Sequence, residues 1–124
     1  MPIHATPEVR AGICVFRPRG TCTLVETVDF IADCVAHCRQ RALGKLVINC
    51  TGLEGPPMPS LVDRFLAVED WARAANGMVV VALVVHARFI HSDKFGSKVA
   101  ADLGLGYEMF ADEAEAFAWI EKAA

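Results

Sequence analysis

The chain has 124 residues, 54% of which are apolar, and a net charge of −3. This length is enough for one domain with a single hydrophobic core, which we expect over residues 1–124. Nucleic acid is excluded as a partner because no cluster of Lys and Arg supplies the basic face that phosphates need. The longest apolar run, residues 78–85, is far shorter than the roughly 18 residues of a membrane span. We therefore expect the apolar surplus in buried strands, in a subunit interface or in a ligand cavity.

The five cysteines favour free thiols in a reducing compartment. Their number is odd and no CxxC pair occurs, while the first ten residues lack the apolar core of a signal peptide. We therefore expect a cytoplasmic protein. Cys34, His37 and Cys38 lie on one predicted helix, with His37 on its polar side, and they do not converge into a metal site without a second cluster of ligands. We interpret the two cysteines as small buried hydrophobes and expect neither metal nor cofactor.

The first half of the chain predicts a strand, a helix and a second strand. Residues 10–17 alternate between apolar and polar as a strand does. Thr23 and Glu26 have the spacing of a capping box at a helix start, and Gly44 is the expected C′ glycine at its end. A second strand follows over residues 46–50. The apolar stripe of the helix consists of Leu24, Val28, Ile31, Val35, Cys38 and Ala42.

Ser60 and Asp63 repeat the capping pattern and predict a second helix, which Asn76 and Gly77 end. Residues 78–85 are apolar on both faces, as is typical of a central strand covered by helices on each side, and we expect all side chains of residues 79–84 to be buried. The expected core stripe of the second helix consists of Leu61, Phe65, Val68, Ala72 and Ala75.

The last third of the chain predicts a helix over residues 93–103 that places Phe95, Val99 and Leu103 in the core, a short strand within residues 105–110, and a final helix. Asp112 caps this final helix, which buries Phe117 and Ile120. Strands and helices thus alternate with short connections, which predicts the α/β class with four to five strands in a mostly parallel or mixed sheet. Right-handed crossovers are expected to place helices on both faces of that sheet.

The candidate site lies in the two loops that follow the second strand and the central strand. Parallel neighbouring strands bring such loops to one edge of the sheet, where the ligands of open α/β sheets gather. Ser60 is an N-cap residue and, with Thr51, a candidate phosphorylation site. His86, Arg88, His91 and Asp93 lie in the second loop. The imidazole and guanidinium groups there are suited to contact with an anion or with a partner's carboxylate. The candidates for binding a partner or ligand are Asn49, Thr51, Glu54, Ser60, Arg64, His86 and Arg88.

No motif in the sequence assembles a catalytic centre. A nucleophile, a base and an oxyanion hole are not combined anywhere, and no GxGxxG, P-loop or GxSxG sequence occurs. We therefore expect that the protein is not an enzyme and assign no catalytic residue.

The order of elements and the passage LVINCTGLEGPPMPSLVDRFLAVEDWARAANGMVVVALVV at residues 46–85 resemble the SpoIIAA-like branch of the STAS-like domains. The resemblance covers about residues 15–120. It implies a mixed β/α superhelix in a small bacterial cytoplasmic protein that acts as a regulatory or ligand-binding module. In anti-sigma-factor antagonists a serine at the start of the second helix is phosphorylated, and Ser60 lies near that position. Pro59 and Leu61 stand where those proteins have an acidic residue and a glycine.

Two functions fit these observations. The first is a regulatory protein-interaction module that presents residues 51–60 to a partner. The second is a binder or carrier of a small apolar or lipid-like ligand, held between the Ser60 helix and the sheet in a pocket of roughly 300 Å³ or more. The surplus of apolar surface also favours a homodimer.

Overall fold

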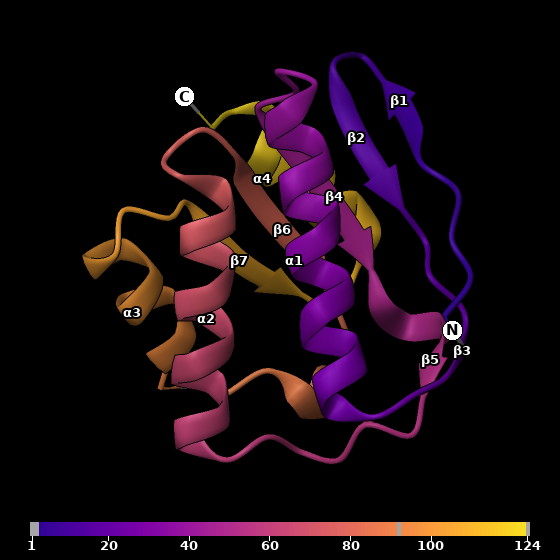
Figure 1. Ribbon diagram of the computed structural model, residues 1–124, viewed down its shortest axis with the longest axis vertical. Coiled ribbons are helices and arrows are strands. Elements are labelled where there is room, and N and C mark those ends of the chain that lie inside the picture. Colours follow the sequence, from indigo (N-terminus) through magenta and orange to yellow (C-terminus); the bar gives the residue numbers. More distant parts are fainter. Residues whose placement is uncertain (1–2, 92, 124) are drawn as a thin grey trace.

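A five-stranded sheet with the strand order β1-β2-β4-β6-β7 forms the centre of the protein (Figure 1). The computed structural model describes residues 3–91 and 93–123. β1 runs antiparallel to β2, and the other neighbouring strands are parallel, so the predicted α/β class with a mostly parallel sheet is confirmed. The strands are β1 (Glu8–Arg10), β2 (Ile13–Phe16), β4 (Lys45–Asn49), β6 (Val80–Val84) and β7 (Tyr107–Phe110), with β3 (Gly20–Thr21) and β5 (Leu53–Glu54) pairing separately. The helices are α1 (Leu24–Gln40), α2 (Leu61–Ala75), α3 (Phe95–Asp102) and α4 (Glu113–Glu121), with short 3-10 turns η1 (Cys50–Gly52) and η2 (Ala87–Phe89).

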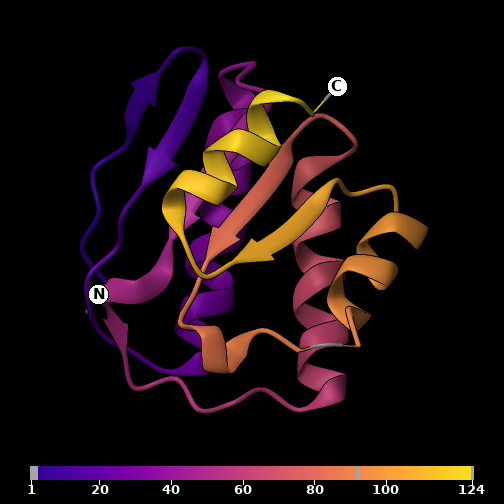
Figure 2. The same ribbon diagram turned by 180° about the vertical axis from the view of Figure 1, so that it is seen from behind.

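Helices α1, α2 and α3 cover one face of the sheet, and α4 covers the other (Figures 1 and 2). The parallel strands are added in one direction, from β2 through β4 and β6 to β7. Because crossovers between parallel strands have one hand, three successive crossovers in one direction place their helices on the same face. Helices do cover both faces, as expected, but the crossover helices all lie on one face. The other face is covered by α4, which follows the last strand. No helix in the described part of the chain is long and apolar enough to cross a bilayer.

β6 is the central strand that its sequence predicted. Val81 and Leu83 face the core under α1, α2 and α3, while Ala82 and Val84 face α4. All four side chains are at most 2% exposed. Val80, at the start of the strand, is half-buried rather than buried as expected.

Residues 10–17 do not form the single strand that their alternation predicted. β1 ends at Arg10, Ala11 and Gly12 turn the chain with φ values of 52° and 81°, and β2 begins at Ile13. Two successive positive φ values belong to the type I′ hairpin turn, whose twist matches that of the paired strands. Such turns usually carry Asn, Asp or Gly at the first of these positions, so Ala11 gave no turn signal.

The capping box predicted for α1 is present, but the helix ends differently from the prediction. Thr23 Oγ1 accepts a hydrogen bond from Glu26 N–H at 3.1 Å, and Glu26 Oε1 accepts one from Thr23 N–H at 2.9 Å. At the other end, Ala42 with a φ of 56° occupies the left-handed position that was assigned to Gly44. Leu43 N–H donates to the Cys38 carbonyl in the last turn at 2.9 Å, as in a Schellman motif.

α2 buries only part of the stripe that its spacing predicted. Val68 and Ala75 are buried as predicted, together with Ala67 and Trp71, and Ala72 is half-buried. Leu61 and Phe65 are instead 53% and 39% exposed. The helix is apolar on two adjacent sides, and the side with Trp71 faces the core because the indole has a large apolar area and its Nε1 donates to the Val28 carbonyl at 3.1 Å. Asn76, with a φ of 47°, ends the helix as predicted.

The C-terminal elements lie close to their predicted positions, but some of their side chains differ from the prediction. β7 lies within the predicted range, but Leu103 is 43% exposed rather than part of the core. Asp112 is the N-cap residue of α4, but its side chain makes no capping hydrogen bond within the described residues. Ile120 is buried as predicted, and Phe117 is half-buried against the same core.

The cysteines lie in apolar surroundings with free thiols. Burial raises the pKa of the Cys34 and Cys38 thiols, and the interpretation of both as small buried hydrophobes is confirmed. His37 is not on the polar side of α1; it is half-buried, with its ring edge-on to that of Phe16 at 5.6 Å. Among residues 3–91 and 93–123, no group of three or more His, Cys, Asp or Glu side chains could hold a metal ion.

Candidate functional site

The loops after β4 and β6 meet at the carboxyl edge of the sheet. The first loop passes through η1 and β5 to Ser60, and the second passes through η2. His86 Nε2 lies 3.1 Å from the carbonyl oxygen of Thr51. The parallel pairing of β4 with β6 therefore brings the two candidate loops into direct contact.

The path of the first loop is fixed by its pairing with the segment before α1. Cys22 N–H donates to the Glu54 carbonyl at 2.8 Å, next to the short β3–β5 ladder. Gly55 has a φ of 106°, and a Cβ there would lie 2.5 Å from the Cys22 carbonyl oxygen. A Cβ on Gly52 would lie 2.8 Å from the Pro18 carbonyl oxygen. Both glycines therefore permit a close approach of two chain segments. The Glu54 side chain is exposed.

Asn49 is hydrogen-bonded to Thr51 and to Glu113 of α4. Asn49 Oδ1 accepts hydrogen bonds from Thr51 N–H at 3.1 Å and from the Thr51 hydroxyl at 2.7 Å, and Asn49 Nδ2 donates to Glu113 Oε2 at 2.8 Å. Arg17 donates to both carboxylate oxygens of Glu113, at 2.8 and 3.0 Å, and to Glu8 at 3.1 Å. Arg17 and Glu113 were not among the predicted site residues, because no local pattern marks a pair 96 residues apart.

The hydrogen bonds to Glu113 predict that the protein loses stability at acidic pH. The hydrogen bonds from Arg17, and then that from Asn49, hold the pKa of the Glu113 carboxyl below its ordinary value of 4.5. Stability from a lowered carboxyl pKa is fully present above the unfolded value and is lost as the pH falls through the folded value. We therefore expect Glu113→Gln to be less stable than the wild type near neutral pH, and the difference to shrink as the pH falls below about 4.5.

Urea unfolding of both proteins at neutral and acidic pH measures this difference. Glu115→Gln, on an exposed residue of the same helix, is the control. A difference between wild type and Glu113→Gln that is the same at both pH values would contradict the role of the Glu113 charge.

Ser60 caps α2 in a complete capping box. Its hydroxyl accepts a hydrogen bond from Asp63 N–H at 3.1 Å, and Asp63 Oδ2 accepts one from Ser60 N–H at 3.1 Å. Ser60 is exposed to solvent, whereas the Thr51 hydroxyl is part-buried and already donates to Asn49. Of the two candidate phosphorylation sites, Ser60 is the one with a solvent-accessible position.

Ser60→Ala is expected to lower the free energy of unfolding by about 1 kcal/mol, because the cap of α2 is lost. Ser60→Asp is expected to stay within about 0.5 kcal/mol of the wild type, since Asp is a good N-cap residue and its charge suits the helix N-terminus. Urea unfolding followed by circular dichroism measures both. Thr23→Ala, which removes the matching cap of α1, is the control. If Ser60→Ala is as stable as the wild type, the capping role is wrong.

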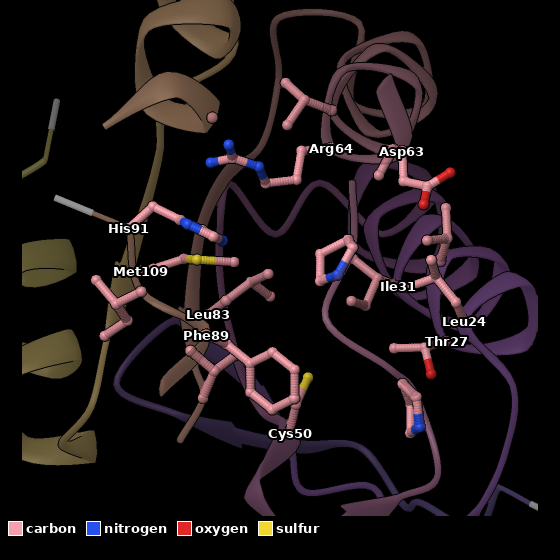
Figure 3. A pocket seen from close by; sticks show the side chains of 18 of the residues that line it. Leu24, Thr27, Ile31, Cys50, Asp63, Arg64, Leu83, Phe89, His91 and Met109 are labelled. Carbon is pink, nitrogen blue, oxygen red and sulfur yellow. The ribbon is translucent and has the colours of Figure 1, made fainter. Parts of the chain in front are cut away.

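A pocket of about 530 Å³ lies beside this edge, between the sheet, α1, α2 and the two loops (Figure 3). Five of the seven candidate residues line it, namely Thr51, Glu54, Arg64, His86 and Arg88. Asn49 and Ser60 are not in its wall. Its apolar wall includes Leu24, Ile31, Cys50, Leu83, Phe89 and Met109.

Arg64 is the most enclosed charged group of the pocket. Its side chain is only 15% exposed, its Nη1 lies 3.4 Å from Asp93 Oδ1, and its guanidinium lies 5.2 Å from the centre of the Phe95 ring. The pKa of Asp93 is lowered by the backbone N–H of Phe95 and by Arg64. Arg88 is exposed and stacks on its neighbour Phe89 at 4.7 Å. Arg64 thus points inward and Arg88 stays at the surface.

Exposed apolar side chains gather at the start of α2. Of nine large hydrophobic residues that are exposed in the described chain, five lie within residues 58–66. We call these five the α2 patch; they are Met58 (46% exposed), Leu61 (53%), Val62 (65%), Phe65 (39%) and Leu66 (50%). The sequence prediction missed this patch because it placed Leu61 and Phe65 in the core. The second apolar side of α2 was the signal that could have revealed it.

Comparisons with known proteins identify the fold. No protein-family model and no curated protein matches the chain. Among solved structures, an anti-sigma factor antagonist from Mycobacterium paratuberculosis is similar, with a TM-score of 0.62 and 12% sequence identity over 97% of this chain and 95% of that one. The unphosphorylated form of the anti-sigma factor antagonist SpoIIAA has a TM-score of 0.52 and 15% identity, over 97% of this chain and 100% of that one.

An uncharacterised protein with a SpoIIAA-like fold from Shewanella loihica is also similar, with a TM-score of 0.51 and 15% identity over 96% of this chain and 94% of that one. The chain therefore has a SpoIIAA-like fold, and the resemblance seen in its sequence is confirmed at the level of the fold.

Proposed function

We propose that the chain is a regulatory protein-interaction module whose partner binds residues 51–60 together with the α2 patch. The observation that carries this proposal is the α2 patch itself, which concentrates exposed apolar side chains beside an exposed Ser60. Apolar patches rimmed by polar residues mark interaction sites on protein surfaces. The fold, shared with two anti-sigma factor antagonists, is consistent with a protein partner.

We propose further that the module is a single domain over residues 1–124, acts in the cytoplasm of a bacterium, and has no catalytic activity. Phosphorylation of Ser60 would regulate it. A phosphate there would stand at the N-terminus of α2, whose free N–H groups favour anions, and would place negative charge at the border of the α2 patch. This change of surface charge would alter partner binding and leave the fold intact.

Pull-down from the native host with purified variants tests the proposal. Val62→Glu and Leu66→Glu place a charge in the α2 patch and are expected to lose the partner. Met78→Glu is the control, because Met78 is also exposed (62%) but lies beyond the other end of α2. Equal capture by all three variants and the wild type would overturn the proposal.

The Ser60 variants and a measurement of self-association separate the remaining alternatives. If phosphorylation regulates binding, Ser60→Asp captures a different amount of partner from Ser60→Ala and the wild type. Equal capture by these three proteins would leave Ser60 as a cap only. Sedimentation velocity measures whether the α2 patch joins two copies of this chain. If the wild type is a homodimer and Leu66→Glu is a monomer, the partner at the patch is a second copy of the chain.

A second candidate function is the binding of a small apolar ligand, which the 530 Å³ pocket favours. Its volume lies within the range of about 300–1,000 Å³ that is usual for small-molecule sites. Native mass spectrometry of freshly purified protein is expected to show a retained ligand. Apo protein alone, together with no binding of any added apolar compound, would contradict this second function.

A further inference from the structure

Two side chains that line the pocket each have a buried nitrogen atom without a hydrogen-bond partner in the described residues. Arg64 Nε and His91 Nε2 are buried and have no hydrogen-bond partner among residues 3–91 and 93–123. Arg64 comes from the first turn of α2 and His91 from the segment after η2, and both side chains reach into the pocket (Figure 3). Buried polar atoms in folded proteins almost always have a partner. Two such atoms in one pocket would be satisfied by a ligand that carries hydrogen-bond acceptors.

The carboxylates near the pocket do not satisfy these two atoms. Glu108 Oε1 is already within hydrogen-bond distance of three donors, and Asp63 closes the capping box of α2. Asp93 is 54% exposed and lies 3.4 Å from Nη1 of Arg64, not from Nε. Glu54 is exposed at the surface. The other basic or imidazole side chains in the wall are His86, Arg88 and Lys94.

The rest of the inner wall is suited to an apolar body. Aliphatic, aromatic and thioether side chains from α1, α2, β6, η2 and β7 line it, including Ile31, Trp71, Leu83, Phe89 and Met109. Arg64 is itself held in place by the ring of Phe95 on one side and by Asp93. A ligand in this pocket would meet a fixed guanidinium and an imidazole at one end and an apolar wall elsewhere.

We propose that the pocket binds an amphipathic anion. Its carboxylate- or phosphate-type head accepts hydrogen bonds from Arg64 Nε–H and His91 Nε2–H, and its apolar body packs between α1, α2 and the sheet. This inference rests on the second candidate function, since it names the class of ligand for the same pocket. An anion is favoured over a neutral apolar compound because a charged acceptor forms stronger hydrogen bonds with a guanidinium.

Isothermal titration of the full chain with decanoate, decyl phosphate and neutral 1-decanol tests the proposal. At least one of the two anions is expected to bind the wild type about tenfold or more tightly than decanol, and the two anions separate a carboxylate from a phosphate head. Arg64→Met and His91→Phe are expected to remove this preference. Arg73→Met is the matched control, because Arg73 is an arginine of the same helix whose side chain is 66% exposed and does not line the pocket.

The Arg64 Nε–H resonance in a nitrogen-correlated NMR spectrum gives a second readout on the wild type, which is needed if Arg64→Met does not fold. A shift of this resonance on adding the anion, and not on adding decanol, supports the proposal. If decanol binds as tightly as both anions, and Arg64→Met changes none of these affinities, the proposed anionic head group is wrong. The proposal that the pocket binds a ligand would still hold in that case. If none of the three compounds binds, both the anion and the ligand function are overturned.

Discussion

Val81→Asp is expected to lower the free energy of unfolding by more than about 4 kcal/mol, which would leave most of the chain unfolded. Val81 is fully buried on β6 and faces the core under α1, α2 and α3. The buried side chains of that core are apolar, so the new carboxylate would lose its hydration without gaining a partner. The effect is large because β6 has neighbouring strands on both sides and helices on both faces.

Circular dichroism and urea unfolding measure this effect. Met78→Asp makes the same chemical change just before β6 at a side chain that is 62% exposed, and it is expected to cost no more than about 0.5 kcal/mol. A Val81→Asp protein that melts within a degree or two of the wild type would show that β6 is not the central strand.

Trp71→Ala is expected to cost about 3–5 kcal/mol, the usual range for removing a large buried aromatic side chain. The indole is 5% exposed, lies 5.7 Å from the ring of Tyr107, and joins α2 to α1 through its hydrogen bond to Val28. Its removal would leave a cavity where α1, α2 and the sheet meet.

Trp71→Phe separates packing from hydrogen bonding. It keeps an aromatic ring and removes the Nε1 donor, so a smaller loss of about 1–2 kcal/mol is expected. Urea unfolding of the two variants gives the comparison. If Trp71→Ala costs no more than Trp71→Phe, the indole does not hold α2 on the core in the way that its burial indicates.

The sequence was most informative where a local pattern has one physical outcome. The capping spacings at Thr23 and Ser60 predicted both helix starts, because a hydroxyl at the N-cap and a carboxylate at N3 satisfy free backbone N–H groups within one turn. The doubly apolar run predicted β6, since only a strand covered on both faces buries such residues. The order of elements then predicted the parallel sheet.

The sequence could not decide between two apolar sides of one helix. Leu61 and Phe65 had the spacing of a core stripe, and the choice of Trp71 over them depends on the position of α1, which is distant in sequence. The same limit applies to Ala11 and Ala42, whose left-handed conformations are imposed by hairpin twist and by the end of α1 rather than by their own preference.

The candidate site shows the same division. Parallel strands predicted that the loops carrying Thr51 and His86 meet, and the structure places them in contact. The hydrogen bonds between Arg17 and Glu113 depend on how α4 packs, and the inward position of His91 depends on how the segment after η2 packs. Neither can be predicted from the spacing of residues in the sequence. Which of the candidate residues act in binding stays a prediction.

Site-specific photo-crosslinking in the native host tests the proposed interaction surface most directly. A photoreactive amino acid is placed at residue 62, in the α2 patch, and in a second protein at residue 78, which is about equally exposed but lies beyond the other end of α2. The account predicts covalent adducts with a partner protein from position 62 and none from position 78. Adducts from position 78 alone, equal adducts from both positions, or none from position 62 would contradict it.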